Sequence, residues 1–224
     1  MVVSDDGHTR CRWCGTDPLY VAYHDDEWGR PVTDADRLFE KICLEGFQSG
    51  LAWITVLRKR DAFREVFDGF GMDAVARFGD RDVERLLGDA RIIRHRGKIE
   101  ATINNARAAA AMRDAGIDLA SHVWSFAPDV PFGRHDGPVT RENLNTTSPA
   151  AVALSADLRR RGWKFVGPTT VYSFMQSMGL VNDHPVGCHV TARCEELRTA
   201  TVAAMRQRSG PRVKRQRSGP RVER

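Results

Sequence analysis

The chain has 224 residues, of which 42% are hydrophobic and 28% charged, and it contains five cysteines. This composition is typical of a folded protein and excludes a disordered, collagen-like or coiled-coil chain. No apolar stretch reaches the ~20 residues needed to cross a bilayer, and the first residues lack the apolar segment of a secretory signal. We therefore expect a cytoplasmic protein that has no membrane partner.

The net charge of +5 is unevenly distributed along the chain. Residues 206–224 hold eight Lys or Arg and one Glu, whereas residues 1–205, with 26 basic and 28 acidic side chains, carry a charge of −2. The segment RQRSGPRV occurs at 206–213 and again at 215–222, and two polar copies are too few for a stacked repeat fold. We expect 196–224 to be a disordered basic tail that either has no role or is weakly attracted to DNA phosphates.

Helical signals follow one another before this tail, and strand patterns are nearly absent. Hydrophobic periodicity and capping residues predict helices at 34–45, 51–57, 62–67, 74–78, 81–87, 98–115, 149–162 and 168–178. Gly46 is expected to end the first of these helices, and a segment rich in proline and glycine at 127–146 is expected to be a loop. The predicted fold class is all-α, with one domain at 10–195 that follows an N-terminal extension at 1–9.

A tight turn between Gly162 and Gly167 joins the last two predicted helices. The start of the second helix, where Thr169 lies, presents free backbone N–H groups that could hold a phosphate without a side chain. The turn resembles the helix-hairpin-helix element of DNA-binding and DNA-repair proteins, which would let a body with a charge of −2 bind DNA. An ordinary connection between helices that contains glycines explains the local sequence equally well.

Cysteine and histidine residues gather near both ends of the body, at Cys11, Cys14 and His24 and at His184, Cys188, His189 and Cys194. Four such ligands in tetrahedral geometry would suit a structural zinc ion, which would clamp the first and last segments together. Scattered buried cysteines and exposed histidines are the alternative. A redox pair at positions 11 and 14 is disfavoured because no βαβ pattern surrounds it.

Aromatic residues and carboxylates concentrate in the first quarter of the chain, with Tyr20 and Glu45 among them. An aromatic box that holds one buried carboxylate would suit a flat cationic ligand, through cation–π contact and charge pairing. Plain core packing of the aromatic side chains, with an exposed carboxylate at a helix end, is the alternative.

Four long blocks that cover roughly residues 10–188 carry a resemblance to a known family. They are DPLYVAYHDDEWGRPV (17–32), LFEKICLEGFQSGLAWITVLRKR (38–60), IIRHRGKIEATINNARA (92–108) and GWKFVGPTTVYSFMQSMGLVNDHPVGC (162–188). In this order they closely resemble the bacterial DNA-3-methyladenine glycosylase I family. The resemblance implies an all-α, monofunctional glycosylase of the helix-hairpin-helix superfamily. Such an enzyme excises 3-methyladenine from alkylated double-stranded DNA and leaves an abasic site.

The resemblance also implies roles for individual residues. It implies that Glu45 and Tyr23 form hydrogen bonds with the base as catalytic residues and that Trp53, Trp28 and Trp13 form aromatic walls. From the turn described above, we expect Gly162, Gly167 and Thr169 to hold DNA phosphates. The resemblance further implies a structural zinc ion held by Cys11, His24, His184 and Cys188. Cys14 and His189 remain rival ligands. No organic cofactor is implied, and we expect a monomer.

Two other functions remain as alternatives at this point. A DNA-binding protein that has lost excision would keep the hairpin and the zinc clamp, but it would lack a pocket residue. A zinc hydrolase would need three ligands and an open water position, which a closed set of four ligands does not provide.

Two further expectations concern single features of the site. We expect a structural role for Asp183, and the turn at 47–52 is our candidate for a wedge that fills the gap left by an extruded base.

Overall fold

The computed structural model describes residues 1–129 and 145–209. The helices of this part are α1 (Pro18–Asp26), α2 (Ala35–Gln48), α3 (Trp53–Leu57), α4 (Arg60–Val66), α5 (Met72–Ala76), α6 (Asp80–Gly88), α7 (Arg96–Asp114), α8 (Leu119–Trp124), α9 (Pro149–Arg160), α10 (Pro168–Ser177) and α11 (Thr191–Ser209), with 3₁₀ turns at Arg12–Cys14 and Asp68–Phe70. The prediction of a mostly helical fold is confirmed. A small antiparallel pair of strands, β1 (Val2–Val3) and β2 (Thr9–Arg10), spans the predicted N-terminal extension at 1–9 and the first residue of the predicted domain.

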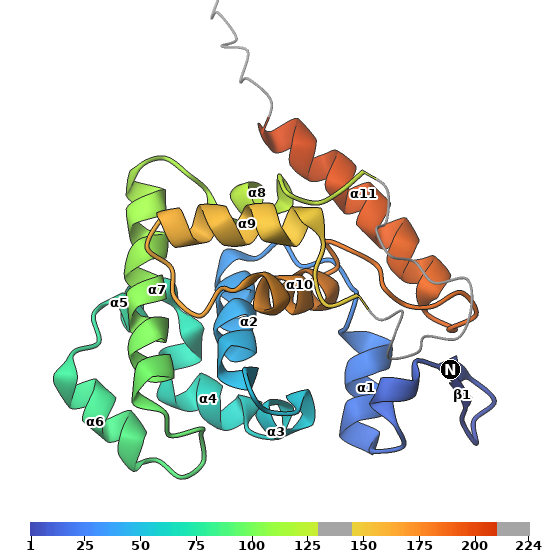
Figure 1. Ribbon diagram of the computed structural model, residues 1–224, viewed down its shortest axis with the longest axis horizontal. Helices are drawn as coiled ribbons and strands as arrows, with labels where there is room; N and C mark the ends of the chain where they lie inside the picture. Colours follow the sequence, from blue (N-terminus) through green and yellow to red (C-terminus); the bar gives the residue numbers. More distant parts are fainter. Residues whose placement is uncertain (130–144, 210–224) are drawn as a thin grey trace, which may run out of the picture.

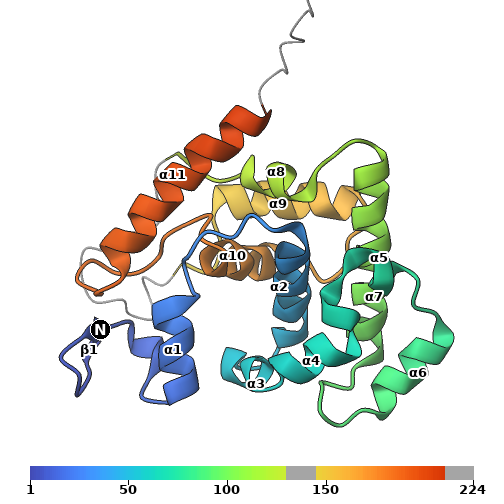
Figure 2. The ribbon, with the colours of Figure 1, turned by 180° about the vertical axis from the view of Figure 1, so that it is seen from behind.

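Helix α2 runs through the middle of the molecule, with α10 packed against it and α9 packed against α10 (Figure 1). Every residue from Leu38 to Phe47 is buried, and Leu38, Phe39, Leu44 and Phe47 are almost completely so. This part of the helix therefore lies inside the core on all its sides, and the polar side chains that it carries there need partners. Seen from behind, α5 packs on α7 at the end of the molecule that lies away from α1 and α11 (Figure 2).

The prediction that Gly46 ends the helix is wrong, because α2 continues to Gln48. A Cβ atom at Gly46 would lie 3.3 Å from the Cβ of Phe165, which belongs to the turn between α9 and α10. The glycine therefore serves close approach of this turn rather than helix termination. The reversal of the chain comes after Ser49, at Gly50, where φ is +83°.

The prediction of a disordered tail from residue 196 is wrong for residues 196–209, which continue α11. Arg198, Val202 and Met205 are buried on one side of this helix, which packs against α8. The Arg198 guanidinium pairs with Glu195 and donates to the carbonyl of Pro128. The duplicated segment lies mostly beyond residue 209, outside the described residues, as does most of the predicted loop at 127–146.

Three helices were not predicted, namely α1, α8 and α11. The start of α1 carries a clear signal, since Asp17 accepts hydrogen bonds from the backbone N–H groups of Leu19 and Tyr20 and Pro18 occupies the first helical position.

Across the described ranges, no helix has the length and apolar character needed to span a membrane.

Candidate functional site

A pocket of about 630 Å³ opens between α1, α2, α3 and α10. Its lining residues include Trp13, Tyr20, Tyr23, Trp28, Glu45, Gln48, Trp53, Thr169, Tyr172, Gln176 and Asp183. All five residues expected to contact a base are among them, although they come from different helices and connections. The volume lies in the range of small-molecule sites.

The pocket has a buried floor and a more exposed mouth. Tyr23, Glu45 and Trp53 form the floor and are between 4% and 7% exposed, whereas Trp13 at the mouth is 37% exposed. The ring centroids of Tyr23 and Trp53 lie 5.5 Å apart, and those of Trp13 and Trp28 lie 5.1 Å apart. The aromatic side chains therefore touch one another around a shared cavity instead of filling it.

The floor contains a buried ion pair that the sequence analysis missed. The Lys41 ammonium lies 2.8 Å from Oε1 of Glu45, donates a hydrogen bond of 2.8 Å to the Tyr23 hydroxyl, and lies 3.2 Å from the centre of the Trp53 ring. Burial raises the pKa of the Glu45 carboxyl above its usual 4.5, and the Lys41 charge opposes this rise. Burial also lowers the pKa of Lys41 to about 8. The spacing of four residues on one helix is the sequence signal that could have revealed this pair.

Asp183, in the segment after α10, also lines the pocket. Its Oδ2 accepts hydrogen bonds from the Tyr172 hydroxyl at 2.5 Å and from Nε2 of Gln176 at 2.7 Å. Both donors belong to α10, so the carboxylate ties the segment after α10 back onto that helix. Burial raises the pKa of Tyr172, and the nearby Asp183 charge adds to this effect.

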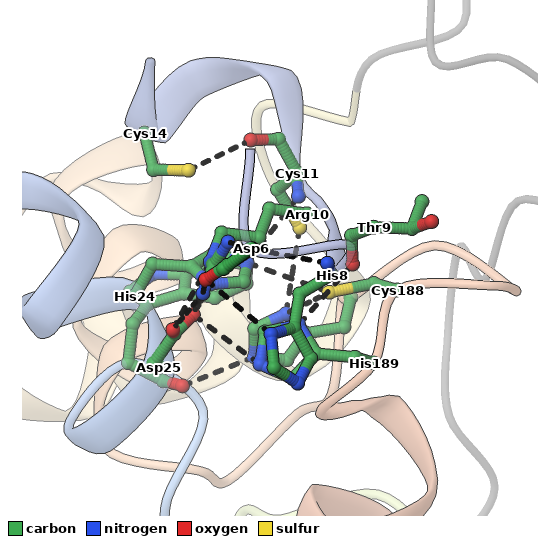
Figure 3. Close-up of polar contacts among 12 residues, drawn as sticks. Asp6, His8, Thr9, Arg10, Cys11, Cys14, His24, Asp25, Cys188 and His189 are labelled. Atoms are coloured by element: carbon green, nitrogen blue, oxygen red, sulfur yellow. Dashed lines mark hydrogen bonds and ion pairs between the residues drawn. The ribbon is translucent and has the colours of Figure 1, made fainter. Parts of the chain in front are cut away.

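Cys11, His24, His184 and Cys188 form a buried cluster beside the pocket, and their candidate ligand atoms all lie within 4.8 Å of one another. Sγ of Cys11 is 3.4 Å from Nδ1 of His184. Sγ of Cys188 is 3.4 Å from Nε2 of His24, and Figure 3 shows Cys11, His24 and Cys188 side by side. The cluster joins the first segment of the chain to the segment before α11. Such a set of sulfur and nitrogen atoms could bind a metal ion.

The nitrogen of each histidine that faces away from the cluster has its own partner. Nδ1 of His24 lies 2.7 Å from Oδ1 of Asp25, which is also held by Arg10, and Nε2 of His184 lies 3.1 Å from the carbonyl oxygen of Trp28. These acceptors fix the proton on the outer nitrogens and leave the inner nitrogens free to bind a metal, as in many metal sites.

The two rival ligands lie outside this cluster. The thiol of Cys14 donates to the carbonyl of Cys11 (Figure 3). The ring of His189 contacts the Thr9 carbonyl and lies 3.5 Å from Oδ1 of Asp25. Among the described residues, only the four residues implied by the resemblance meet as one group.

The turn between α9 and α10 is fixed to α7 by two asparagines. Nδ2 of Asn104 donates to the carbonyl of Gly162, and the Asn105 side chain bonds both the N–H and the carbonyl of Lys164. Gly162 is exposed and has φ +86°, a conformation that favours glycine. Gly167 caps α10 without lining the pocket.

Thr169, in the first turn of α10, both faces solvent and lines the pocket. The predicted phosphate-binding residues therefore lead from an exposed turn to the mouth of the pocket.

The turn at 47–52 borders the same opening. Gln48 lines the pocket, and Leu51 is 42% exposed. The buried Lys98 ammonium donates to the carbonyls of Phe47 and Ser49 and so holds this turn in place. Its use as a wedge stays a prediction.

Comparisons with known proteins agree on one family. The family model described as methyladenine glycosylase matches residues 13–191. DNA-3-methyladenine glycosylase 1 of Escherichia coli strain K12 is 54% identical over 179 residues, which are 80% of this chain and 95% of that protein.

Solved structures give the same result. A crystal structure of 3-methyladenine DNA glycosylase I is similar with a TM-score of 0.76 and 52% identity, covering 81% of this chain and 98% of that one. A structure of the Staphylococcus aureus enzyme, which describes how it recognises 3-methyladenine, gives a TM-score of 0.74 and 34% identity, with 81% and 96% covered.

Proposed function

The chain belongs to the methyladenine glycosylase family, and we propose that it excises 3-methyladenine from alkylated double-stranded DNA by hydrolysing the N-glycosidic bond, leaving an abasic site. The observation that carries this proposal is the pocket in which Tyr23, Glu45 and Trp53 meet. The nucleotide would be extruded from the duplex into this pocket, at a cost of a few kcal/mol of lost stacking.

Charge is the property by which the pocket would select its base. Adenine methylated at N3 carries a positive charge, whereas normal adenine is neutral. A carboxylate about 4 Å from that charge contributes about 4 kcal/mol at an effective dielectric constant of about 20. A desolvated cation–π contact with an indole adds ~2 kcal/mol. Glu45 and the tryptophans of the pocket therefore favour the alkylated base.

Shape and hydrogen bonding would complete this recognition. The base would lie between Trp53 on the floor and Trp13 and Trp28 nearer the mouth, with its edge toward Tyr23 and Glu45.

The chemical step needs little protonation by the protein, because the positive charge already weakens the bond to deoxyribose. As this bond breaks, its electron pair passes to the base, which leaves neutral, and the positive charge moves to the sugar. The oxygen of a water molecule then bonds to the sugar carbon and releases a proton. The proposal includes no amine nucleophile and no strand cleavage.

The turn between α9 and α10 would hold the DNA as a helix-hairpin-helix element. Unpaired N–H groups at the start of α10 attract phosphate oxygens without reading sequence. Gly162, Gly167 and Thr169 are the proposed phosphate contacts. The position of Thr169 at the pocket would place the extruded nucleotide within reach of Glu45.

The four-residue cluster fits a structural zinc ion. With metal–sulfur bonds of ~2.3 Å and metal–nitrogen bonds of ~2.0 Å, tetrahedral angles place sulfur and nitrogen about 3.5 Å apart. The separations of 3.4 Å for Cys11–His184, 3.4 Å for Cys188–His24 and 3.6 Å for Cys188–His184 match this value. Zinc would clamp the ends of the folded body, and its four protein ligands leave no position for catalysis.

Two general properties complete the proposal. We also propose that the protein acts in the cytoplasm and as a monomer; its five cysteines form no disulfide, which fits a reducing compartment.

The release of free base from methylated DNA tests the function. The purified protein, without added metal or nucleotide cofactor, should release 3-methyladenine, which chromatography separates from other purines. Release no greater than that of a heated control without enzyme would refute the excision and would favour a silent DNA-binding protein.

A further inference from the structure

Lys41 contacts the three floor residues of the pocket without lining the pocket itself. Its ammonium reaches Glu45, Tyr23 and the Trp53 ring, while the lining residues do not include Lys41. The side chain is 5% exposed. A cation placed behind a site for a cationic base needs an explanation, because like charges disfavour such a base.

The contacts of Lys41 set the direction of each floor group. Lys41 engages Oε1 of Glu45, which leaves Oε2 for a ligand. It donates to the Tyr23 oxygen, which leaves the hydroxyl hydrogen of Tyr23 free to donate elsewhere. It covers one face of the Trp53 ring and leaves the other for stacking. A single ammonium thus orients three groups that belong to three different helices.

We propose that Lys41 is a positioning residue for base recognition, which orients Glu45, Tyr23 and Trp53 from behind the pocket and keeps the Glu45 carboxylate ionised. The inference rests on the proposed excision of 3-methyladenine. It adds to that function a residue that tunes the negative charge presented to the base.

The neighbouring charges agree with this role. Burial raises the pKa of Glu45, and Lys41 is the group that opposes the rise. The other charged groups that act on Lys41 are Arg60 and Glu27, which form an ion pair with each other at 2.5 and 2.8 Å. Because those two charges largely cancel, the Glu45 carboxylate depends on Lys41 for its counterion.

The test is the pH dependence of single-turnover excision of 3-methyladenine by wild type, Lys41→Met and Lys41→Arg. Loss of an adjacent opposite charge raises a carboxyl pKa by about one unit or more. We therefore expect the acid limb of the Lys41→Met profile to lie at least about one pH unit above that of wild type, with activity strongly reduced near pH 6. Lys41→Arg should keep the wild-type limb.

At higher pH the difference between the two proteins should shrink. Once Glu45 is ionised in Lys41→Met, no neighbouring cation opposes the charged base, and only the lost orientation of the three floor groups still lowers excision. A deficit that is large near pH 6 and much smaller at high pH indicates that Lys41 keeps Glu45 ionised. A uniform loss at every pH, with an unchanged midpoint, would overturn the proposal because it would reflect only a structural role.

Folding is checked by circular dichroism and thermal melting at each pH, and Lys41→Gln replaces Lys41→Met if the latter does not fold. If both neutral variants fail to fold while Lys41→Arg folds, the charge serves folding and the proposal is overturned. A wild type that releases no 3-methyladenine refutes the proposed function instead. An active wild type with an unshifted Lys41→Met profile refutes only the role of Lys41.

Discussion

Glu45→Gln isolates the charge of the pocket floor from its shape. The glutamine keeps the size of the side chain and one oxygen acceptor, but it removes the negative charge and replaces the second oxygen with an NH2 donor. At about 4 Å and an effective dielectric constant of about 20, this charge contributes about 4 kcal/mol to holding a cationic base, which corresponds to about a thousandfold.

The Lys41 charge must be included in this calculation, because its ammonium lies 2.8 Å from the Glu45 carboxylate and repels a cationic base. Adding this separation places Lys41 about 7 Å from the base, where its repulsion is worth about 2.4 kcal/mol on the same scale. If Lys41 keeps its proton in the variant, this repulsion is the same in both proteins, and the loss in kcat/KM for excision should be about a thousandfold. If Lys41 loses its proton when its partner is removed, the repulsion disappears in the variant, and the loss should be only about twentyfold.

Glu40→Gln is the matched control for this experiment. Glu40 is also buried on α2 and also has a cationic partner, Arg64 at 2.8 Å, but it does not line the pocket. Excision of 3-methyladenine from a methylated duplex is measured by chromatography of the released base at subsaturating enzyme. A loss of less than threefold in a folded Glu45→Gln variant, or an equal loss in Glu40→Gln, would refute electrostatic recognition by Glu45.

Three further predictions concern the scaffold of this site. Cys188→Ser should lose the single zinc ion per chain and lower the melting temperature, while Cys14→Ser should keep it; equal zinc in both variants by metal analysis would remove Cys188 from the ligand set. Gly46→Val should overpack the contact with Phe165 and destabilise the protein by ~1–3 kcal/mol in urea unfolding, whereas Gly88→Val, at a position with open space, should not. A chain that ends at residue 209 should excise normally, and its DNA binding should depend less on salt. A chain that ends at residue 195 should lose ~3 kcal/mol or more of unfolding free energy, because the side chains of Val202 and Met205 are then missing from the core. Equal stability of the two chains would show that the packing of α11 is unimportant.

Local sequence patterns predicted the helices that carry caps and apolar periodicity. Helices α7, α9 and α10 begin and end within about two residues of their predicted bounds. The end of α2 could not be predicted, because the role of Gly46 depends on Phe165, which is distant in the sequence. A glycine that permits close packing and a glycine that ends a helix look alike in a single sequence.

The C-terminal helix shows a different kind of error. The high positive charge of the last residues dominated the prediction, although Arg198, Val202 and Met205 recur at a spacing of four and three residues, as on one face of a helix. The arginine obscured this pattern because it is buried through its bonds to Glu195 and to the Pro128 carbonyl. Composition alone could not reveal those partners.

The candidate site was predicted by its resemblance to a family far more than by local pattern. Tyr23, Glu45 and Trp53 belong to three helices, and nothing in their spacing shows that they share a cavity. Lys41 was missed for the same reason, since its contacts with Tyr23 and Trp53 arise only when α1, α2 and α3 pack together. Only its pairing with Glu45 is local.

Selectivity and rate make different demands on these residues. The proposed attraction between Glu45 and a cationic base would stabilise the bound substrate, and only the part that persists in the transition state would speed the reaction. During bond cleavage the positive charge moves from the purine to the sugar, so it stays in the pocket but changes its distance from Glu45. A carboxylate nearer the purine raises affinity more than the rate at saturation, whereas one nearer the sugar raises both. The ratio of the losses in kcat/KM and in the saturating single-turnover rate of Glu45→Gln therefore reports where the carboxylate lies relative to the breaking bond.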